Sequence, residues 1–429
     1  AGGCLCQSDA GMKTGPGAED RGPRGPLSVA GEQPAHGPWP AAPGKGPKAV
    51  GAIPLSLYIH IPWCVSKCPY CDFNSHAVRE PIDQDAYVDA LLFDLEHEVT
   101  RKPLPSIESI FIGGGTPSLF DGAAIARLLE GIAQRIGLAS DAEITLEANP
   151  GTAEAAHFSA YRAAGVSRLS IGVQSLDDSA LAALGRIHSA AEARSAYELA
   201  RAAGFDNINL DLMYGLPQHA SAAALDDLGQ IIDLGPEHIS WYQLTLEPNT
   251  LFHHRPPPLP DEDSLVDMME GGQAMLADAG YLQYEISAYA RDGRQCRHNL
   301  NYWRFGDYLG IGAGAHGKLS FPGSHIQRRG KQRQPAAFMA AAAQGAIVLE
   351  REIARDELAV EFFLNTLRLT AGVPAGLFES RTGLALDTVE RPLTRARELG
   401  LMLDDPTRLQ PSAHGQRYLN DLLVLFEPD

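Results

Sequence analysis

Short runs of apolar and β-branched residues alternate with longer helical patterns from residue 54 onward, and this alternation repeats six times. Each apolar run is followed by a turn signal and then by a helical stretch, which is typical of parallel strands joined by crossover helices. We therefore expect an α/β fold. The predicted strands are 55–61, 107–113, 142–148, 167–173, 207–213 and 238–246.

Polar and glycine-rich residues gather directly after the last apolar residue of several predicted strands. They include 113–117, Glu147, Gln174 and Asp211. In parallel α/β barrels this edge carries cofactors and substrates. Six units predict a partial, TIM-like (β/α)6 barrel over 54–290, which can splay and leave a lateral opening for a larger substrate.

The pattern changes after about residue 290. Residues 291–349 contain a Tyr- and Gly-rich stretch and a Gly/Arg-rich segment, 323–333, that we expect to be a connecting loop. Residues 350–429 predict a mainly helical, winged-helix-like domain, and their excess of acidic residues favours a structural cap over DNA binding. Its predicted elements are helices at 356–369, 374–382, 388–399 and 412–425 and a short hairpin near 401–410.

Residues 1–53 contain 20 Gly or Pro and almost no apolar periodicity, so we expect a disordered tail without chemistry at Cys4 or Cys6. No apolar run is long enough for a transmembrane helix. The formal charge of −18 argues against nucleic acid as a partner. Six cysteines, three of them clustered, indicate metal ligation in a reducing compartment, and we expect the cytoplasm.

Three of the cysteines, Cys64, Cys68 and Cys71, follow the first predicted strand in the sequence YIHIPWCVSKCPYC. A structural zinc site would take four protein ligands, and the only other thiol after the tail, Cys296, lies far along the chain. Three thiolates therefore indicate either a missing distant ligand or a [4Fe–4S] cluster with one open iron. An open iron can bind the amino and carboxylate groups of S-adenosylmethionine (SAM).

This motif resembles the cluster loop of the radical SAM superfamily, and within it the chain is similar to the HemN/HemW group from about residue 54 to the C-terminus. The resemblance implies that SAM contacts several residues. They are Tyr58, Tyr70, Gly114, Gly115, Thr116, Glu147, Gln174, Arg186 and Asp211. In the oxidase relatives the last three positions contact a second SAM; whether one binds here stays open. Glu147 and Asp211 could instead be strand-end carboxylates that cap a helix.

The resemblance leaves two functions open: a haem chaperone, or an oxygen-independent coproporphyrinogen III oxidase of porphyrin biosynthesis. The oxidase pattern carries a fourth Cys where this chain has Phe73, and it has an ordered N-terminal region where this chain has the Gly/Pro tail. The segment His298-Asn299-Leu-Asn-Tyr302-Trp303 resembles a motif associated with haem binding in HemW-type proteins. The haem chaperone is therefore favoured, and oxidase activity is not expected.

His298 could supply an imidazole to haem iron, while Tyr302 and Trp303 offer flat faces to a porphyrin. His316 and Cys296 are alternative ligands, and a structural role is open for each of them. The expected cofactors are thus one [4Fe–4S] cluster, SAM and haem. The expected partners are haem-acceptor proteins and an electron donor, with peripheral membrane contact only through such partners.

Overall fold

The computed structural model describes residues 53–151 and 155–428. Residues 1–52, which make up nearly all of the predicted tail and include Cys4 and Cys6, lie outside the described residues.

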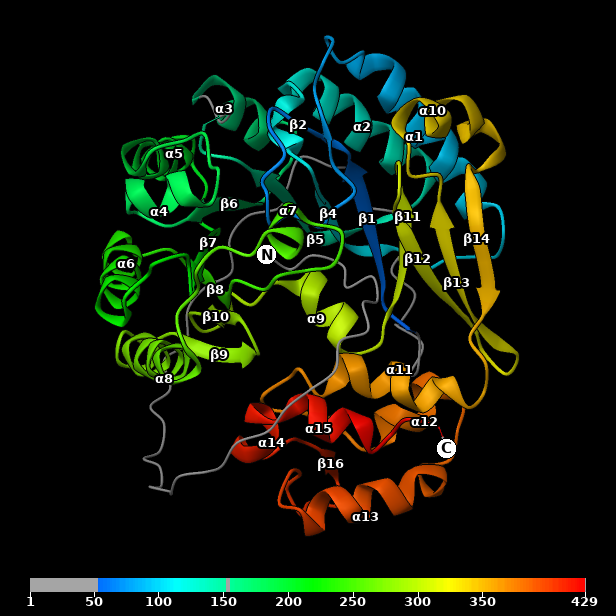
Figure 1. The fold of residues 1–429 in the computed structure, drawn as a ribbon. Coiled ribbons are helices and arrows are strands. Elements are labelled where there is room, and N and C mark those ends of the chain that lie inside the picture. Colours follow the sequence, from blue (N-terminus) through cyan, green and yellow to red (C-terminus); the bar gives the residue numbers. More distant parts are fainter. Residues whose placement is uncertain (1–52, 152–154, 429) are drawn as a thin grey trace.

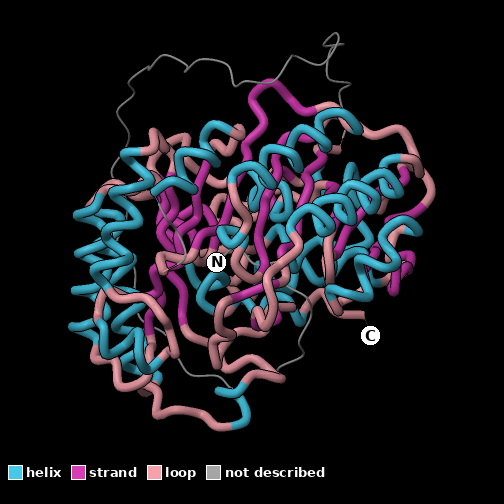
Figure 2. The backbone as a smooth tube through the Cα atoms, turned by 90° about the horizontal axis from the view of Figure 1, so that it is seen from above, coloured by secondary structure: helices cyan, strands magenta, loops and turns pink. Residues whose placement is uncertain are grey.

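The six predicted strands are confirmed, with ends that differ by a few residues. They pair in parallel and in chain order, and helices lie around the outside of the curved sheet (Figures 1 and 2). Since the end strands of the sheet do not pair with each other, the barrel is partial, as expected. The strands are β1 (Leu55–Ile61), β4 (Ile107–Gly114), β5 (Leu138–Ala148), β6 (Arg168–Gln174), β7 (Ile208–Tyr214) and β8 (His238–Gln243).

Alternate side chains of each strand enter different environments. On β1, Leu57 and Ile59 belong to the apolar core shared with the surrounding helices, whereas the hydroxyl of Ser56 bonds that of Ser109 on β4 inside the barrel. The period of two in a strand separates these faces. The barrel interior is therefore polar and can carry chemistry.

Side-chain caps fix where several of the outer helices begin. Asp83 and Asp121 accept backbone N–H groups at the starts of α1 and α2, and Ser189 with Glu192 forms a capping box on α5. The helices over the barrel are α1 (Gln84–Val99), α2 (Gly122–Arg135), α3 (Ala155–Ala163), α4 (Asp178–Ala183), α5 (Ala190–Ala202), α6 (Ser221–Leu234), α7 (Leu251–His254) and α8 (Glu262–Asp278).

The sheet extends beyond the six predicted strands at both edges. Residues 323–333 are not a loop, because most of them form β13. The segment after residue 290 contains α9 (Arg297–Trp303), β11 (Asp307–Ile311), β12 (His316–Phe321), β13 (His325–Lys331), α10 (Pro335–Ala341) and β14 (Ile347–Glu352). β11 pairs in parallel with β1, and β12 to β14 follow in antiparallel order. At the other edge β10 (Ala288–Ala290) and β9 (Leu282–Glu285) are antiparallel.

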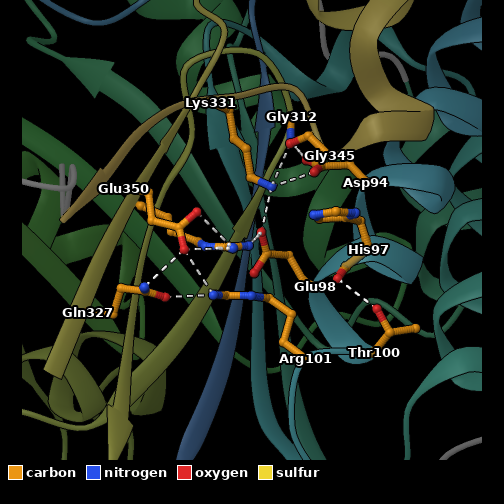
Figure 3. A network of polar contacts seen from close by, with 11 residues as sticks. Asp94, His97, Glu98, Thr100, Arg101, Gly312, Gln327, Lys331, Gly345 and Glu350 are labelled. Carbon is orange, nitrogen blue, oxygen red and sulfur yellow. Dashed lines mark hydrogen bonds and ion pairs between the residues drawn. The ribbon is translucent and has the colours of Figure 1, made fainter. Parts of the chain in front are cut away.

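A network of buried charges attaches this extension to α1 (Figure 3). Lys331 of β13 donates from Nζ to Asp94 Oδ1 at 2.5 Å and to Glu98 Oε1 at 2.6 Å. Arg329 pairs with Glu98 and with Glu350 of β14. The charged side chains that made this strand resemble a loop are therefore neutralised inside the structure.

The C-terminal region is mainly helical, as predicted, and lies against α9 (Figure 1). Its elements are α11 (Glu357–Thr366), β15 (Val373–Pro374), α12 (Gly376–Thr382), α13 (Glu390–Glu398), β16 (Arg408–Leu409), α14 (Ala413–Arg417) and α15 (Leu419–Val424). The predicted short hairpin near 401–410 is present: Met402 and Pro411 form an antiparallel bridge, flanked by hydrogen bonds from the Leu403 N–H to the Gln410 carbonyl and from the Ser412 N–H to the Leu401 carbonyl, both at 3.0 Å. In addition, β16 pairs with β15, which the sequence did not predict. The predicted last helix is divided at Tyr418.

Candidate functional site

A cavity of about 330 Å³ lies at the carboxyl ends of the barrel strands. It brings together most of the residues that the sequence singled out, although they come from six separate segments of the chain. These are Cys64, Cys68, Tyr70, Cys71, Gly114, Gly115, Thr116, Glu147, Gln174, Arg186 and Asp211. The prediction that polar residues after successive strands meet at one edge is confirmed.

The loop that carries the three cysteines is held at both of its ends. The short strands β2 (Trp63–Cys64) and β3 (His76–Ala77) pair in parallel where the loop leaves and rejoins the barrel. In between, Asn74 donates from Nδ2 to the carbonyls of Ala313 at 2.9 Å and Arg333 at 2.8 Å. The loop is thus fixed to the sheet extension as well as to the barrel.

The three thiols face one cavity without forming a site for a single ion. In the part of the chain that the structure describes, no three His, Cys, Asp or Glu side chains gather closely enough to hold one metal. Thiolates that share a zinc ion lie within about 4 Å of each other, because each Zn–S bond is about 2.3 Å. A [4Fe–4S] cluster binds each thiolate to a different iron, so three thiols around one cavity can hold it without sharing an ion.

Burial raises the pKa of the Cys64 thiol, which lies near Thr116 and Ser75, and raises that of Cys71 to about 11. Thiols in such surroundings stay protonated until a metal displaces the proton. The site therefore favours thiolates only when a metal group occupies it.

The glycines after β4 leave room that a side chain would fill. A Cβ on Gly115 would lie 2.4 Å from the Trp63 carbonyl oxygen, and one on Gly114 would lie 2.6 Å from the His60 ring. Gly114 also has a φ of +117°. This turn can come close to the cluster loop only because these positions lack side chains.

Two carboxylates lie at the base of the cavity. Glu147 accepts a hydrogen bond from the Gly114 N–H at 3.0 Å, and desolvation together with the nearby Asp211 raises the pKa of Glu147 to about 7. Asp211 accepts hydrogen bonds from Asn209 Nδ2 at 2.9 Å and from the Ser170 hydroxyl at 3.2 Å. None of these hydrogen bonds caps a helix, so the structure does not support the alternative that Glu147 and Asp211 serve as helix caps.

Gln174, at the end of β6, has a φ of +70°, which is unusual for a residue with a side chain. Its Oε1 accepts a hydrogen bond from the Tyr242 hydroxyl at 2.7 Å. Tyr242 and Asn149 also line the cavity, but no sequence motif pointed to them. Asn149 directly follows the predicted strand 142–148, whereas Tyr242 lies inside the predicted strand 238–246, so only Asn149 had a positional signal.

Tyr58 does not line the cavity, although the sequence placed it among the SAM contacts. Its hydroxyl lies 2.9 Å from His60 Nδ1, while His60 Nε2 lies 2.9 Å from the Asn74 carbonyl. Because a carbonyl only accepts, Nε2 carries the proton and the Tyr58 hydroxyl donates to Nδ1. Tyr58 is thereby connected to the cluster loop through His60.

The residues predicted to contact haem lie at the opposite end of the barrel. His298, Asn299, Tyr302 and Trp303 are all buried on α9. His298 Nδ1 lies 3.1 Å from the hydroxyl of Ser109, near the start of β4, whereas the cavity begins at Gly114. Five residues of strand separate these positions by about 16 Å.

Both ring nitrogens of His298 have protein partners, since Nε2 lies 3.0 Å from the Tyr302 hydroxyl. Burial, and then the Arg168 cation, lower the pKa of His298 to about 3. Trp303 packs beneath the Arg368 guanidinium at 4.4 Å, in the apolar cluster shared with the C-terminal region. Ligation of haem iron by His298 stays a prediction, and it requires α9 to move.

The two alternative haem ligands also lie outside the cavity. The Cys296 thiol is fully buried and donates to Glu143 Oε1 at 3.6 Å, and burial raises its pKa to about 12. His316 is half-buried at the start of β12, and its backbone packs against Gly310.

Residues 58–226 match the Radical SAM superfamily, and residues 353–418 match the HemN C-terminal domain. The heme chaperone HemW of Escherichia coli (strain K12) is 52% identical over 374 residues, which cover 87% of this chain and 98% of that protein. The chain belongs to the HemW-type family of radical SAM proteins.

Other proteins similar to this HemW-type chain include the heme chaperone HemW of Haemophilus influenzae, with 51% identity covering 87% of this chain and 98% of that protein. A mitochondrial radical S-adenosyl methionine domain-containing protein 1 of Bos taurus is 35% identical, with 90% of each chain covered. Coproporphyrinogen III oxidase (HemN) of E. coli has the same fold, with a TM-score of 0.74, 24% identity, and coverage of 88% of this chain and 91% of that one.

Within residues 53–151 and 155–428 of this HemW-type protein, every helix is too short or too polar to cross a bilayer.

Proposed function

We propose that this protein is a haem chaperone: it holds one [4Fe–4S] cluster and SAM, binds haem and passes it to acceptor proteins. The observation that carries the proposal is the 52% identity to a protein named heme chaperone HemW along nearly all of that protein's length. Phe73 at the position of the fourth oxidase cysteine supports it. An electron donor for the cluster and the haem acceptors complete the proposed partners.

Cys64, Cys68 and Cys71 would hold the cluster and leave one iron open for SAM. A reduced cluster with SAM bound supplies the chemistry of a 5′-deoxyadenosyl radical. The backbone of Gly114 and Gly115 would border the methionyl group, where the absence of side chains permits a close approach. SAM would also meet Tyr70, Thr116, Glu147, Gln174 and Asp211 along the cavity wall.

The charge of the cavity supports SAM rather than a porphyrinogen as its occupant. Four carboxylates and three thiols line it, whereas Arg186 is the only cation among the described residues of the lining. SAM carries a sulfonium cation and a single carboxylate, which suits this balance. A porphyrinogen carries several propionates, and an anion of that kind would need several cations to replace its hydration.

The size of the cavity leads to the same conclusion. A volume of about 330 Å³ is near the lower end of the range for small-molecule sites. We infer that the cavity takes one SAM beside the cluster, and that haem binds elsewhere. The buried His298-Asn299-x-x-Tyr302-Trp303 segment would reach haem after movement of α9 away from β4.

A Soret-band titration of haem into the full-length protein tests this proposal. We expect saturation near one haem per chain, and a shifted or lost Soret band in His298→Ala. His238→Ala is the matched control, because His238 is equally buried in the barrel and both of its ring nitrogens have partners, Asn209 and Tyr284. The control should leave the Soret band unchanged.

Two results would count against the proposal. Weak, non-saturating haem uptake by the wild type would remove its central claim. Conversion of coproporphyrinogen III to protoporphyrinogen IX by the anaerobically reconstituted protein, well above a cluster-free control, would establish the oxidase instead. Equal effects of the His298 and His238 variants would assign His298 a structural role and place the haem ligand elsewhere.

A further inference from the structure

Three acceptors hold the guanidinium of Arg186 in one orientation. Its Nη2 donates to Asn149 Oδ1 at 2.8 Å and to the Gly172 carbonyl at 2.9 Å. It also lies 3.5 Å from His188 Nδ1. His188 Nε2 lies 3.0 Å from the Val173 carbonyl, which can only accept, so Nδ1 is unprotonated and accepts from Arg186.

This orientation directs the other nitrogen of the guanidinium at a cysteine of the cluster loop. Arg186 Nη1 donates to Cys68 Sγ at 3.6 Å, within the range of a hydrogen bond to sulfur. Among residues 53–151 and 155–428, no carboxylate lies within ion-pair distance of Arg186. A cation held in a cavity without a carboxylate partner favours an anion beside it.

We propose that Arg186 sets the reduction potential of the cluster through its charge and its N–H···S bond to Cys68. The proposal rests on the proposed cluster site and deepens it. A [4Fe–4S] cluster with thiolate ligands is an anion, and reduction adds a further negative charge to it. A fixed cation and a hydrogen bond to a ligand sulfur stabilise the reduced form more than the oxidised form, and so raise the potential.

The resemblance to the oxidase relatives assigns Arg186 a different role, a contact to a second SAM. The two roles separate when no SAM is present, because a contact to SAM then has no effect on the cluster. The contacts of Arg186 do not require a ligand, since Cys68, Asn149 and Gly172 all belong to the chain.

The test is a potentiometric titration of the reconstituted, SAM-free, full-length protein, followed by the EPR signal of the reduced cluster. At the midpoint potential of the wild type, Arg186→Gln should have an about tenfold lower ratio of reduced to oxidised cluster. For one electron this corresponds to a midpoint potential that is lower by about 59 mV. Lys67→Gln is the matched control: Lys67 also lies on the cluster loop and is exposed, but it donates to the Phe73 carbonyl rather than to sulfur. Its removal should shift the potential much less.

A second variant keeps the proposal testable if Arg186→Gln does not retain a cluster. Asn149→Ala keeps the charge but removes an acceptor that holds Arg186, so the potential should fall by a smaller amount than in Arg186→Gln. The proposed role of Arg186 would be overturned if the Arg186 and Asn149 variants had the potential of wild type, or shifted no more than Lys67→Gln. Such a result would not affect the proposed cluster site. Wild-type protein that takes up no cluster would instead overturn the proposed function, and this inference with it.

Discussion

The charge of Glu147, a carboxylate of the cavity wall, changes near neutral pH. Its pKa is raised to about 7 because desolvation and Asp211 oppose ionisation more than the Gly114 N–H favours it. Above this pH the carboxylate is charged and attracts the SAM cation; below it the proton removes that attraction. His60 and His188, whose pKa values burial lowers to about 4, stay neutral in this range.

We therefore expect the affinity for SAM to fall as the pH drops below about 7, by up to about tenfold per pH unit. Glu147→Gln should bind SAM weakly at every pH and without this slope. Equilibrium binding of SAM to the cluster-loaded protein between about pH 6 and pH 8 measures both. The same slope in wild type and Glu147→Gln would show that another group controls the pH dependence.

The sequence predicted which single residues meet in the cavity where those residues lie near the carboxyl end of a parallel strand. Glu147 and Gln174 lie at the carboxyl ends of β5 and β6, which meet at one edge of the sheet, so their convergence follows from local pattern. Asp211 lies in the middle of β7 and still lines the same cavity. The position of His298 was not predictable in this way. Residue type indicates that an imidazole can bind iron, but only the tertiary structure shows that Ser109 and Tyr302 occupy both of its nitrogens.

At the scale of elements, the glycine-rich segment after β11 holds the cluster loop in place. Gly314 has a φ of +82°, and a Cβ there would lie 2.4 Å from Asn74 Nδ2. Gly314→Ala should displace Asn74 from its two carbonyl partners and free the loop. We expect several-fold faster loss of iron from the reconstituted protein during challenge with a chelator.

Gly323→Ala is the control that separates the cost of a positive φ from the cost of the clash with Asn74. Gly323 also has a positive φ, +72°, but a Cβ there would meet no atom within 4 Å. This control should lose about 1 kcal/mol of stability through its backbone conformation alone and should retain iron like the wild type. Equal rates of iron loss in the two variants would mean that contact with Asn74 is unimportant for the cluster loop.

The elements that sequence analysis missed are those whose stability depends on distant parts of the chain. β13, with the sequence HIQRRGK, has the glycine and charges of a loop, yet Arg329 and Lys331 are buried in it. Their partners lie on α1, more than 200 positions earlier in the sequence. Local propensity cannot contain that information, because the neighbouring strands and ion pairs determine whether such a segment forms a strand.

At the scale of the whole molecule, this connection joins α1 of the first βα unit to β13 and β14 at one edge of the sheet (Figure 3). Lys331→Met would leave the buried carboxylates of Asp94 and Glu98 without their shared cation, although Arg329 still pairs with Glu98. Removal of one partner from a buried ion pair costs about 3–5 kcal/mol. We expect a loss of that size in the free energy of unfolding, measured by denaturant titration.

Arg101→Met is the control for Lys331→Met, since it also removes a cation from this network, but at the solvent-exposed edge of the network. Arg101 pairs with Glu350, whose side chain is 41% exposed, so solvent screens the pair and its removal should cost less than about 1 kcal/mol. If the Lys331 variant lost no more stability than the Arg101 variant, β13 would be held by backbone pairing alone. A large loss confined to Lys331→Met would instead mean that the sheet extension must neutralise the buried carboxylates of α1 in order to stay in place. The same extension supplies the Ala313 and Arg333 carbonyls that hold Asn74 and the cluster loop.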